Sequence, residues 1–331
     1  MKTMRAAAAG LTAAMLLGLT ACSGGTASNP STDPGKSADT TTYTIGVVQQ
    51  MQHEALDAAT QGFQDALTEK LGDQVTIKVE NASGDSNNCN TIVGSFLSNG
   101  VDLIMANGTT ALQSAASATE DVPILGTSIT EYGVALGIDN FDGVTGFNVS
   151  GTSDLAPLDE QAEMLHTFFP DATKVGLLSC SAEPNSAYQV QTVRGYLEDM
   201  GYTCTDYTFS DSNDLAAVAE SACANEEVLY IPTDNTAAQN AELIGNIALA
   251  AGTPIIAGEE GICKGCGVAT LTISYYDIGY KTGEMAYDIL VNGADPAEMA
   301  IEYAPQFTPK YNADICAELG ITPPAGYEAI Q

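Results

Sequence analysis

Basic residues are scarce in this sequence, and tryptophan is absent. The 331 residues include 10 Lys and Arg against 42 Asp and Glu, which gives a formal net charge of −32. A field of this sign repels nucleic acid and anionic lipid headgroups, so we exclude both as partners. Charged residues are nevertheless only 16% of the chain, and Gly is frequent. This composition is typical of a globular protein and not of a disordered one.

Sequence motifs of common enzymes are also missing. The chain has no G-x-S-x-G, no H-E-x-x-H, no P-loop and no glycine-rich dinucleotide fingerprint. We therefore expect no enzyme, no catalytic residue and no cofactor. Cys263-Lys264-Gly265-Cys266 keeps a thiol oxidoreductase open as a less favoured alternative. Redox C-x-x-C pairs open a helix directly after a strand, whereas here we expect a Glu-Glu-Gly-Ile loop before the pair and a strand at 268–273 after it.

The first 42 residues have the pattern of a lipoprotein signal followed by a tether. Lys2 and Arg5 precede an apolar run over 6–21, which is too short to span a bilayer stably, and Leu19-Thr20-Ala21-Cys22 has the form of a lipidation site. We expect residues 1–21 to be a signal peptide, Cys22 to be lipidated and 22–42 to be flexible. This predicts a protein anchored to the cell membrane by lipid on the extracytoplasmic face. Without Lys2 and Arg5 the net charge becomes −34.

Seven cysteines remain if Cys22 carries lipid, and an odd number leaves at least one thiol without a partner in this chain. Cys180 with Cys204 is one candidate disulfide, provided that the strands that carry them are neighbours at bridging distance. Cys263 with Cys266 is the other. A structural zinc competes for the C-x-x-C pair, but no second C-x-x-C and no paired His accompany it, so we expect no metal site.

The most informative feature is an internal repeat of roughly 130 residues. The apolar run 43–48 resembles 173–178, and each is followed by a polar loop and a helical pattern, at 55–71 and at 186–200. Further strands follow in matched order at 75–80 and 203–209, at 101–105 and 227–231, and at 122–126 and 253–257. Alternating strands and helices predict parallel sheets covered on both faces. We therefore expect an α/β protein of two similar doubly wound lobes, with a ligand cleft at the carboxyl ends of the strands.

On its motifs the chain resembles the family of ABC-transporter substrate-binding lipoproteins that includes tryptophan and phenylalanine binders. The resembling stretches are Ile45-Gly46-Val47-Val48-Gln49 with His53, Ala55-Leu56-Asp57, Asn81-Ala82 with Gly84-Asp85, Val101-Asp102-Leu103-Ile104, Ala182-Glu183-Pro184-Asn185-Ser186, Pro232-Thr233-Asp234-Asn235-Thr236, Gly258-Glu259-Glu260-Gly261, Ser274-Tyr275-Tyr276-Asp277-Ile278-Gly279 and Thr282-Gly283-Glu284-Met285-Ala286.

The resemblance implies a type I periplasmic-binding fold whose lobes are joined by three crossovers, near 148–154, 273–276 and 298–302. The first lobe would be 43–150 plus 274–299, and the second 151–273 plus 300–331. It further implies a monomeric solute-binding component of an importer with ABC permease and ATPase subunits as partners. A ligand-sensing receptor for a membrane signalling partner would use the same fold and remains an alternative.

The chain departs from the family pattern at three places. Family members usually carry Pro at the positions of Glu54 and Thr110 and an aromatic residue at the position of Gln50. We expect Gln50 and Met51 at the cleft mouth, where they would alter the pocket for the ligand side chain. The identity of the ligand stays open on this ground.

Candidate ligand-binding residues lie at the predicted strand ends. Thr109, Thr110, Asn185 and Ser186 lie where a strand turns into a helix, and such a turn suits a carboxylate, although each could equally be a plain helix cap. Asp234 follows an apolar strand and could pair with an ammonium group. The remaining candidates are Gln49, His53, Ser128, Asn235, Glu259 and Tyr275. Together they predict a small zwitterion as ligand, an amino acid with an aromatic or large apolar side chain.

Overall fold

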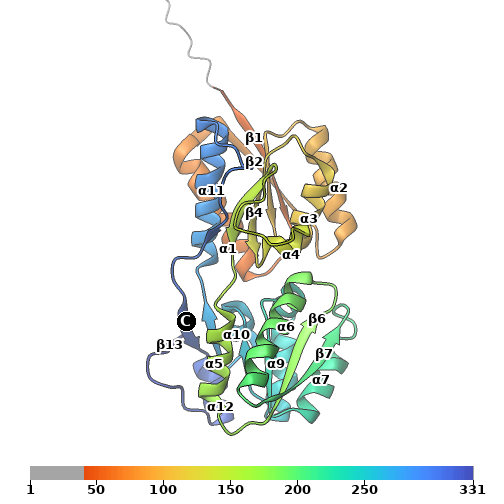
Figure 1. Ribbon diagram of the computed structural model, residues 1–331, viewed down its shortest axis with the longest axis vertical. Coiled ribbons are helices and arrows are strands. Elements are labelled where there is room, and N and C mark those ends of the chain that lie inside the picture. The colour runs from red at the N-terminus through yellow and green to blue at the C-terminus, as the bar shows by residue number, and fades with distance from the viewer. Residues whose placement is uncertain (1–40, 331) are drawn as a thin grey trace, which may run out of the picture. The chain divides into compact units, whose positions relative to one another are not determined.

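The computed structural model describes residues 41–330, which fold into two α/β lobes (Figure 1). The signal peptide, Cys22 and nearly all of the tether predicted above lie outside the described residues. In the part of the chain that is described, no helix is both long and apolar enough to cross a bilayer.

The first lobe is built on a six-stranded sheet in which all neighbours run parallel, in the order β11-β5-β4-β3-β1-β2. Its strands are β1 (Tyr43–Gln49), β2 (Val75–Asn81), β3 (Leu103–Asn107), β4 (Ile124–Ile129), β5 (Val149–Ser153) and β11 (Glu302–Tyr303). Its helices are α1 (Glu54–Leu71), α2 (Ser86–Ser98), α3 (Thr109–Ala118), α4 (Tyr132–Leu136) and α11 (Tyr275–Asn292), with a 3-10 turn at Gly72–Gln74.

The second lobe repeats this plan on a seven-stranded sheet in the order β13-β12-β10-β9-β8-β6-β7, in which only β12 and β10 are antiparallel neighbours. Its strands are β6 (Lys174–Cys180), β7 (Thr203–Phe209), β8 (Val228–Ile231), β9 (Ile255–Ala257), β10 (Ala269–Thr272), β12 (Thr308–Tyr311) and β13 (Glu328–Ala329). Its helices are α5 (Leu158–Phe168), α6 (Pro184–Asp199), α7 (Leu215–Asn225), α8 (Asn235–Gln239), α9 (Ala241–Ala251), α10 (Glu260–Cys266) and α12 (Ala313–Leu319).

The two lobes share one topology, which confirms the predicted repeat and fold class. The order β2-β1-β3-β4-β5 of the first lobe corresponds strand by strand to β7-β6-β8-β9-β10 of the second. Helices cover both faces of each sheet, and the central strands β3 and β8 are buried along their whole length. In the first lobe α1 and α11 cover one face and α2 and α3 the other, as Figure 1 shows. In the second, α5 and α6 oppose α7 and α9.

The first and third crossovers lie slightly later in the chain than expected, and the second lies within the predicted range. Strand β5 pairs with β4, and β11 pairs with β5, so both belong to the first sheet. The chain therefore crosses between the lobes at 154–157, at 273–274 and at 304–307. The predicted lobe boundary after residue 150 cuts through β5, and the boundary after residue 299 comes before β11. Both strands complete the first sheet, so both boundaries were placed too early in the chain.

The expected disulfides are not formed. Cys89, Cys180, Cys204, Cys223, Cys263, Cys266 and Cys316 are all free. Strands β6 and β7 are neighbours as anticipated, but Cys180 pairs in register with Phe209, whereas Cys204 pairs with Val175. Five residues of strand separate the two positions, roughly 16 Å, far beyond bridging distance. Cys263 and Cys266 are buried in α10, and α10 already begins at Glu260 where a loop was predicted.

Candidate ligand site between the lobes

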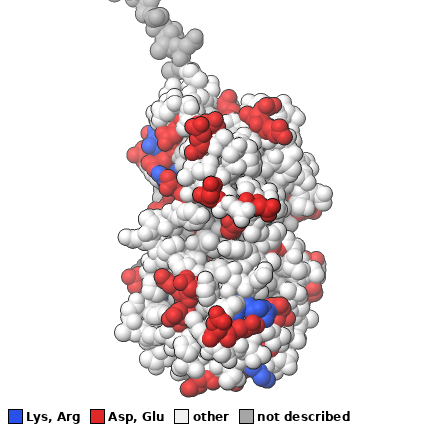
Figure 2. Space-filling model, viewed as in Figure 1, with Lys and Arg blue, Asp and Glu red and all other residues white. Residues whose placement is uncertain are grey.

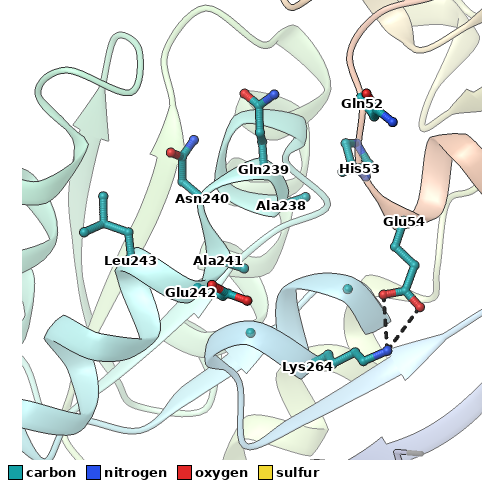
Figure 3. Close-up of a pocket in the computed structure, with 12 residues that line it drawn as sticks. Gln52, His53, Glu54, Ala238, Gln239, Asn240, Ala241, Glu242, Leu243 and Lys264 are labelled. Atoms are coloured by element: carbon teal, nitrogen blue, oxygen red, sulfur yellow. Dashed lines mark hydrogen bonds and ion pairs between the residues drawn. The ribbon is translucent and has the colours of Figure 1, made fainter.

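The predicted cleft lies where strand ends of the two lobes face each other. A cavity of about 620 Å³ opens between Gln52, His53 and Glu54 of the first lobe and residues 238–243 and Lys264 of the second (Figure 3). Glu54 and Lys264 form an ion pair across it at 3.3 Å, with both side chains at least half exposed. Such an exposed pair contributes little to affinity. The cavity lies between the two lobes and is lined by both polar and apolar residues.

His53 and Asn235, both predicted site residues, meet across the two lobes. His53 Nε2 lies 3.1 Å from Asn235 Oδ1. Asn235 Nδ2 donates to Glu183 Oε2 at 2.7 Å, which leaves its Oδ1 facing the imidazole, so His53 Nε2 is the donor. Burial lowers the pKa of His53, which favours the neutral ring. This hydrogen bond joins the two lobes, and we refer to the His53–Asn235 contact as the latch.

Glu183 organises the second lobe's side of the latch. Its buried carboxylate accepts hydrogen bonds from the backbone N–H groups of Asn235 and Thr236, at 3.0 and 2.9 Å, and from both of their side chains. Four donors on one carboxylate fix the start of α8 and hold Asn235 in place for His53. Sequence reasoning quoted Glu183 within a motif but did not select it as a site residue.

Asp234 has partners different from the expected ammonium group. One oxygen accepts the N–H of Cys180 at 2.7 Å and the other accepts the N–H of Ala237 at 2.8 Å. The side chain is 1% exposed, and Ser186 lies beside it. Burial, with Glu183 nearby, raises the pKa of Asp234 to about 7. Asp234 is thus the N-cap of α8 and ties α8 to the end of β6, a role inside its own lobe.

The start of α3 is also occupied from within its lobe. Gln50 Oε1 accepts the backbone N–H of Thr110 at 2.9 Å, so that N–H is not available to a ligand carboxylate. Gln50 and Met51 were expected at the cleft mouth. They are 4% and 5% exposed, so both side chains are buried instead. The contact needs a residue without a side chain at Gly108, where a Cβ would lie 2.7 Å from Gln50 Oε1 and φ is +103°.

Two further candidates have their side chains engaged inside one lobe. Gln49 donates to Met51 O and Asp57 Oδ1 and accepts from Thr60 Oγ1, so it joins β1 to α1. Glu259 accepts from the N–H groups of Gly261 and Ile262 and caps α10. Burial raises the pKa of Glu259 to about 7.

Tyr275 joins two of the three crossovers. Its hydroxyl donates to Asp154 Oδ2 at 3.0 Å, and Asp154 lies on the first crossover directly after β5. The same phenol lies beside Thr233 of the second lobe, and its pKa is raised well above the usual value by burial. Tyr275 also lines a second cavity of about 330 Å³ with Glu54, Glu259 and Lys310. The Tyr275 hydroxyl therefore connects the start of α11 to the first crossover.

Three buried polar atoms of the described chain, at a strand end, at the first crossover and at a helix start, have no hydrogen-bond partner. Among residues 41–330, Ser128 Oγ, Asp154 Oδ1 and Asn185 Oδ1 are fully enclosed and accept or donate no hydrogen bond. Ser128 is also one of three non-glycine residues with positive φ in the described part of the chain, at +55°, where β4 and β5 change register. Unpaired buried atoms and backbone strain each carry a free-energy cost and concentrate at functional sites. Sequence reasoning missed Asp154, although an acidic residue at a predicted crossover was a usable signal.

The thiols of the C-x-x-C pair are not suited to redox chemistry. Burial raises the pKa of Cys263 and of Cys266 far above the usual value, and catalytic thiols need the opposite shift. No group of three or more His, Cys, Asp or Glu among residues 41–330 is placed to hold a metal ion. The pair is packed into the core of the second lobe with Ile262 and Ala257.

Two equivalent parallel-sheet lobes with a hinged cleft define a type I periplasmic-binding protein. A family model for ABC transporter substrate binding proteins matches residues 44–326, and the chain belongs to this family, whose members bind solutes and are not enzymes. A tyrosine-binding protein of Clostridioides difficile is 34% identical over 275 residues, which cover 82% of this chain and 79% of that protein.

Solved structures agree with this assignment. A Streptococcus pneumoniae ABC domain in complex with L-Trp is 30% identical, with a TM-score of 0.83 over 88% of this chain and 100% of that chain. A ligand-free, open substrate-binding protein of Clostridium difficile is 34% identical, with a TM-score of 0.67 over 87% and 99%. The open protein has the higher sequence identity to this chain but the lower TM-score. This indicates that its two lobes are arranged differently from those of this chain. The His53–Asn235 contact agrees with a closed cleft.

Proposed function

We propose that this protein is the extracytoplasmic solute-binding component of an ABC importer and that it captures an amino acid with an aromatic or large apolar side chain. The observation that carries the ligand class is the similarity along nearly the full chain to a tyrosine-binding protein and to a domain solved with L-Trp. A closed cleft with unpaired buried polar atoms supports it, because such atoms require a polar ligand to offset their burial.

Ligand capture would proceed by closure of the lobes about the three crossovers. The latch between His53 and Asn235 forms when the cleft closes, and the unpaired polar atoms then meet the ligand in the absence of water. We assign Ser128 and Asn185 to ligand contact, together with Thr109 at the start of α3 in the first lobe. Gln49, Thr110, Ser186, Asp234 and Glu259 are assigned to the walls that position these groups, and Tyr275 to the hinge.

Calorimetry of the purified protein against the twenty amino acids tests the ligand class. We expect saturable heat with tyrosine, tryptophan or phenylalanine and little with charged amino acids. Mass spectrometry of small molecules released on denaturation tests the same point on ligand that co-purifies. Binding of a sugar or nucleoside with no heat from any amino acid would reject the ligand class.

Attachment to the membrane is a separate proposal that rests on Leu19-Thr20-Ala21-Cys22. A lipid on Cys22 would hold the binding lobes beside the permease and ATPase subunits of the importer. Cys22→Ala should release the protein from the membrane fraction while ligand affinity stays the same. A variant that still partitions into detergent would contradict lipidation at Cys22.

A further inference from the structure

Several buried side-chain atoms in the described part of this protein have no hydrogen-bond partner. Six buried side-chain atoms among residues 41–330 have no partner, and Asn107, Glu226 and Thr270 account for three of them, each inside one lobe. The other three are Ser128 Oγ, Asp154 Oδ1 and Asn185 Oδ1. Two of these three are pure acceptors, and the hydroxyl of Ser128 can also accept. A ligand group that completes this set has to supply several N–H or O–H donors.

These three atoms belong to one connected group of residues. The N–H of Asp154 donates to Ile129 O at 3.2 Å, which places Asp154 beside the end of β4 that carries Ser128. Asp154 Oδ2 accepts from Tyr275, and the Tyr275 phenol lies beside Thr233. Thr233 O in turn accepts from Asn185 Nδ2 at 3.1 Å. The chain of contacts thus runs from the first lobe through the hinge to the second lobe.

Asp154 carries a charge that nothing in the described chain balances. It is 5% exposed, and none of the ion pairs formed by residues 41–330 includes it. Burial raises the pKa of this carboxyl to about 6 despite hydrogen bonds from Tyr275 and Thr130, so the anion is destabilised as it stands. A cation at Oδ1 would offset this cost.

Asp234, the other acidic candidate, does not present the same need. Both of its oxygens already accept a backbone N–H, from Cys180 and Ala237, and it is absent from the unpaired atoms. On the basis of the amino-acid ligand proposed above, we infer that the α-ammonium group of the ligand binds at the hinge, to Asp154 Oδ1 and Asn185 Oδ1 with Ser128 Oγ, and not at Asp234.

An ammonium group has three N–H donors, which equals the number of these unpaired acceptors. The acceptors come from β4, from the first crossover and from the start of α6, which moves with the second lobe. An ammonium group would therefore bridge the lobes, and closure would depend on it. The protein would select amino acids against carboxylates that lack the amine, because those leave Asp154 buried and unpaired.

The experiment compares amino acids with their deaminated analogues by calorimetry. Tyrosine is paired with 3-(4-hydroxyphenyl)propionate and tryptophan with indole-3-propionate, against wild type, Asp154→Asn and Asp234→Asn. In wild type the amino acid should bind on the order of 30-fold or more tightly than its analogue. Asp154→Asn should reduce this ratio to a few-fold with the analogue's affinity kept, and Asp234→Asn should leave the ratio unchanged.

Asp154→Asn keeps an oxygen that can accept from Tyr275, so a purely structural role of Asp154 predicts equal losses for both ligands and an unchanged ratio. That outcome would overturn the inference. If Asp154→Asn does not fold, Asn185→Leu decides, since the inference requires it to lower the ratio as well. Wild type that binds neither amino acid would reject the proposed function itself, whereas binding with an unaltered ratio in the variants rejects only the ammonium site.

Discussion

At the residue scale, the strand ends of this protein carry two kinds of polar side chain. Some, such as Asp234 and Glu183, have every oxygen paired to the backbone or to neighbouring side chains of their own lobe. Others, such as Ser128 and Asn185, are just as buried but hold an unpaired atom. Side chains of the first kind hold the local structure together. Those of the second kind have an atom that can still form a hydrogen bond with a ligand.

Removal of Asp234 should cost the second lobe much of its stability. Asp234→Ala leaves the N–H groups of Cys180 and Ala237 buried without a partner, so we expect a loss of about 2–4 kcal/mol in the free energy of unfolding. Urea denaturation at pH 7 measures it. Asp85→Ala is the matched control, because Asp85 caps α2 with one hydrogen bond at an exposed site and should cost only about 1 kcal/mol. Equal costs for the two variants would argue against the structural role of Asp234.

Loss of the latch should weaken ligand binding modestly. His53→Ala removes the hydrogen bond to Asn235 that closes the cleft, and one such bond contributes about 1 kcal/mol, or roughly fivefold in Kd. His53→Gln keeps an N–H donor and should retain most of the affinity. Calorimetry with the same amino acid on both variants provides the comparison. An unchanged Kd in His53→Ala would mean that the contact does not contribute to closure.

At the scale of elements, α1 and α11 pack so closely that two positions in their contact have no room for a Cβ atom. A Cβ at Gly279 would lie 2.0 Å from Ala59 O, and one at Gly62 would lie 2.1 Å from Tyr276 O. The two helices come from opposite ends of the chain and cover one face of the first sheet together (Figure 1). Helix α11 also begins at the second crossover, so this packing fixes the hinge to the first lobe.

A methyl group in this contact should therefore destabilise the fold. Gly279→Ala forces the helices apart, and overpacking of this kind costs typically about 1–3 kcal/mol. Gly94→Ala is the control, since Gly94 lies in the exposed interior of α2 with nothing within 4 Å, and there Ala should stabilise by about 0.5–1 kcal/mol. Urea unfolding of both variants tests the sign. A neutral Gly279→Ala would show that the helices can separate without cost.

At the scale of the whole molecule, acidic side chains far outnumber basic ones. Figure 2 shows them spread over the displayed face with few basic ones between them. The net charge of −32 adds self-repulsion to the folded state. Three buried carboxyls act in the same direction, because burial raises the pKa of Asp154 to about 6 and those of Asp234 and Glu259 to about 7.

Stability should accordingly fall as the pH rises from 5 to 8. The folded state holds the protons of the three carboxyls more tightly than the unfolded chain, whose pKa values lie near 4, so the stabilisation present below pH 4 is lost as the pH passes 6 to 7. His53 acts oppositely, since burial lowers its pKa, but it is one group against three. We expect Tm to drop by on the order of 5 °C between pH 5 and pH 8.

Thermal melts at low and high salt separate the two contributions. About 0.5 M salt screens the surface repulsion but not the buried groups, so the pH dependence should persist in part. Asp154→Asn should make it shallower. A Tm that rises steadily from pH 5 to pH 8 would contradict the assignment of raised pKa values to the buried carboxyls.

The sequence by itself determined the alternation of strands and helices, the internal repeat and hence the two lobes. These follow from hydrophobic periodicity, which is a local property of the chain and survives without knowledge of the contacts. For that reason the first helix, expected at 55–71, was found at Glu54–Leu71, and the strand expected at 203–209 was found at Thr203–Phe209. Strand ends also predicted which loops face the cleft.

Only the tertiary structure decided which of those strand-end groups remain open to a ligand. Asp234 and Asp154 look alike in sequence, each acidic and close behind a strand, but Asp234 meets the N–H of Cys180, 54 residues away, whereas one oxygen of Asp154 meets nothing. Strand register likewise decided that Cys180 and Cys204 form no disulfide. They lie on neighbouring strands but at different positions along the strand direction. A hydrogen bond or a disulfide needs atoms within a few ångströms, and residues distant in sequence reach that separation only through the packing of the whole lobe.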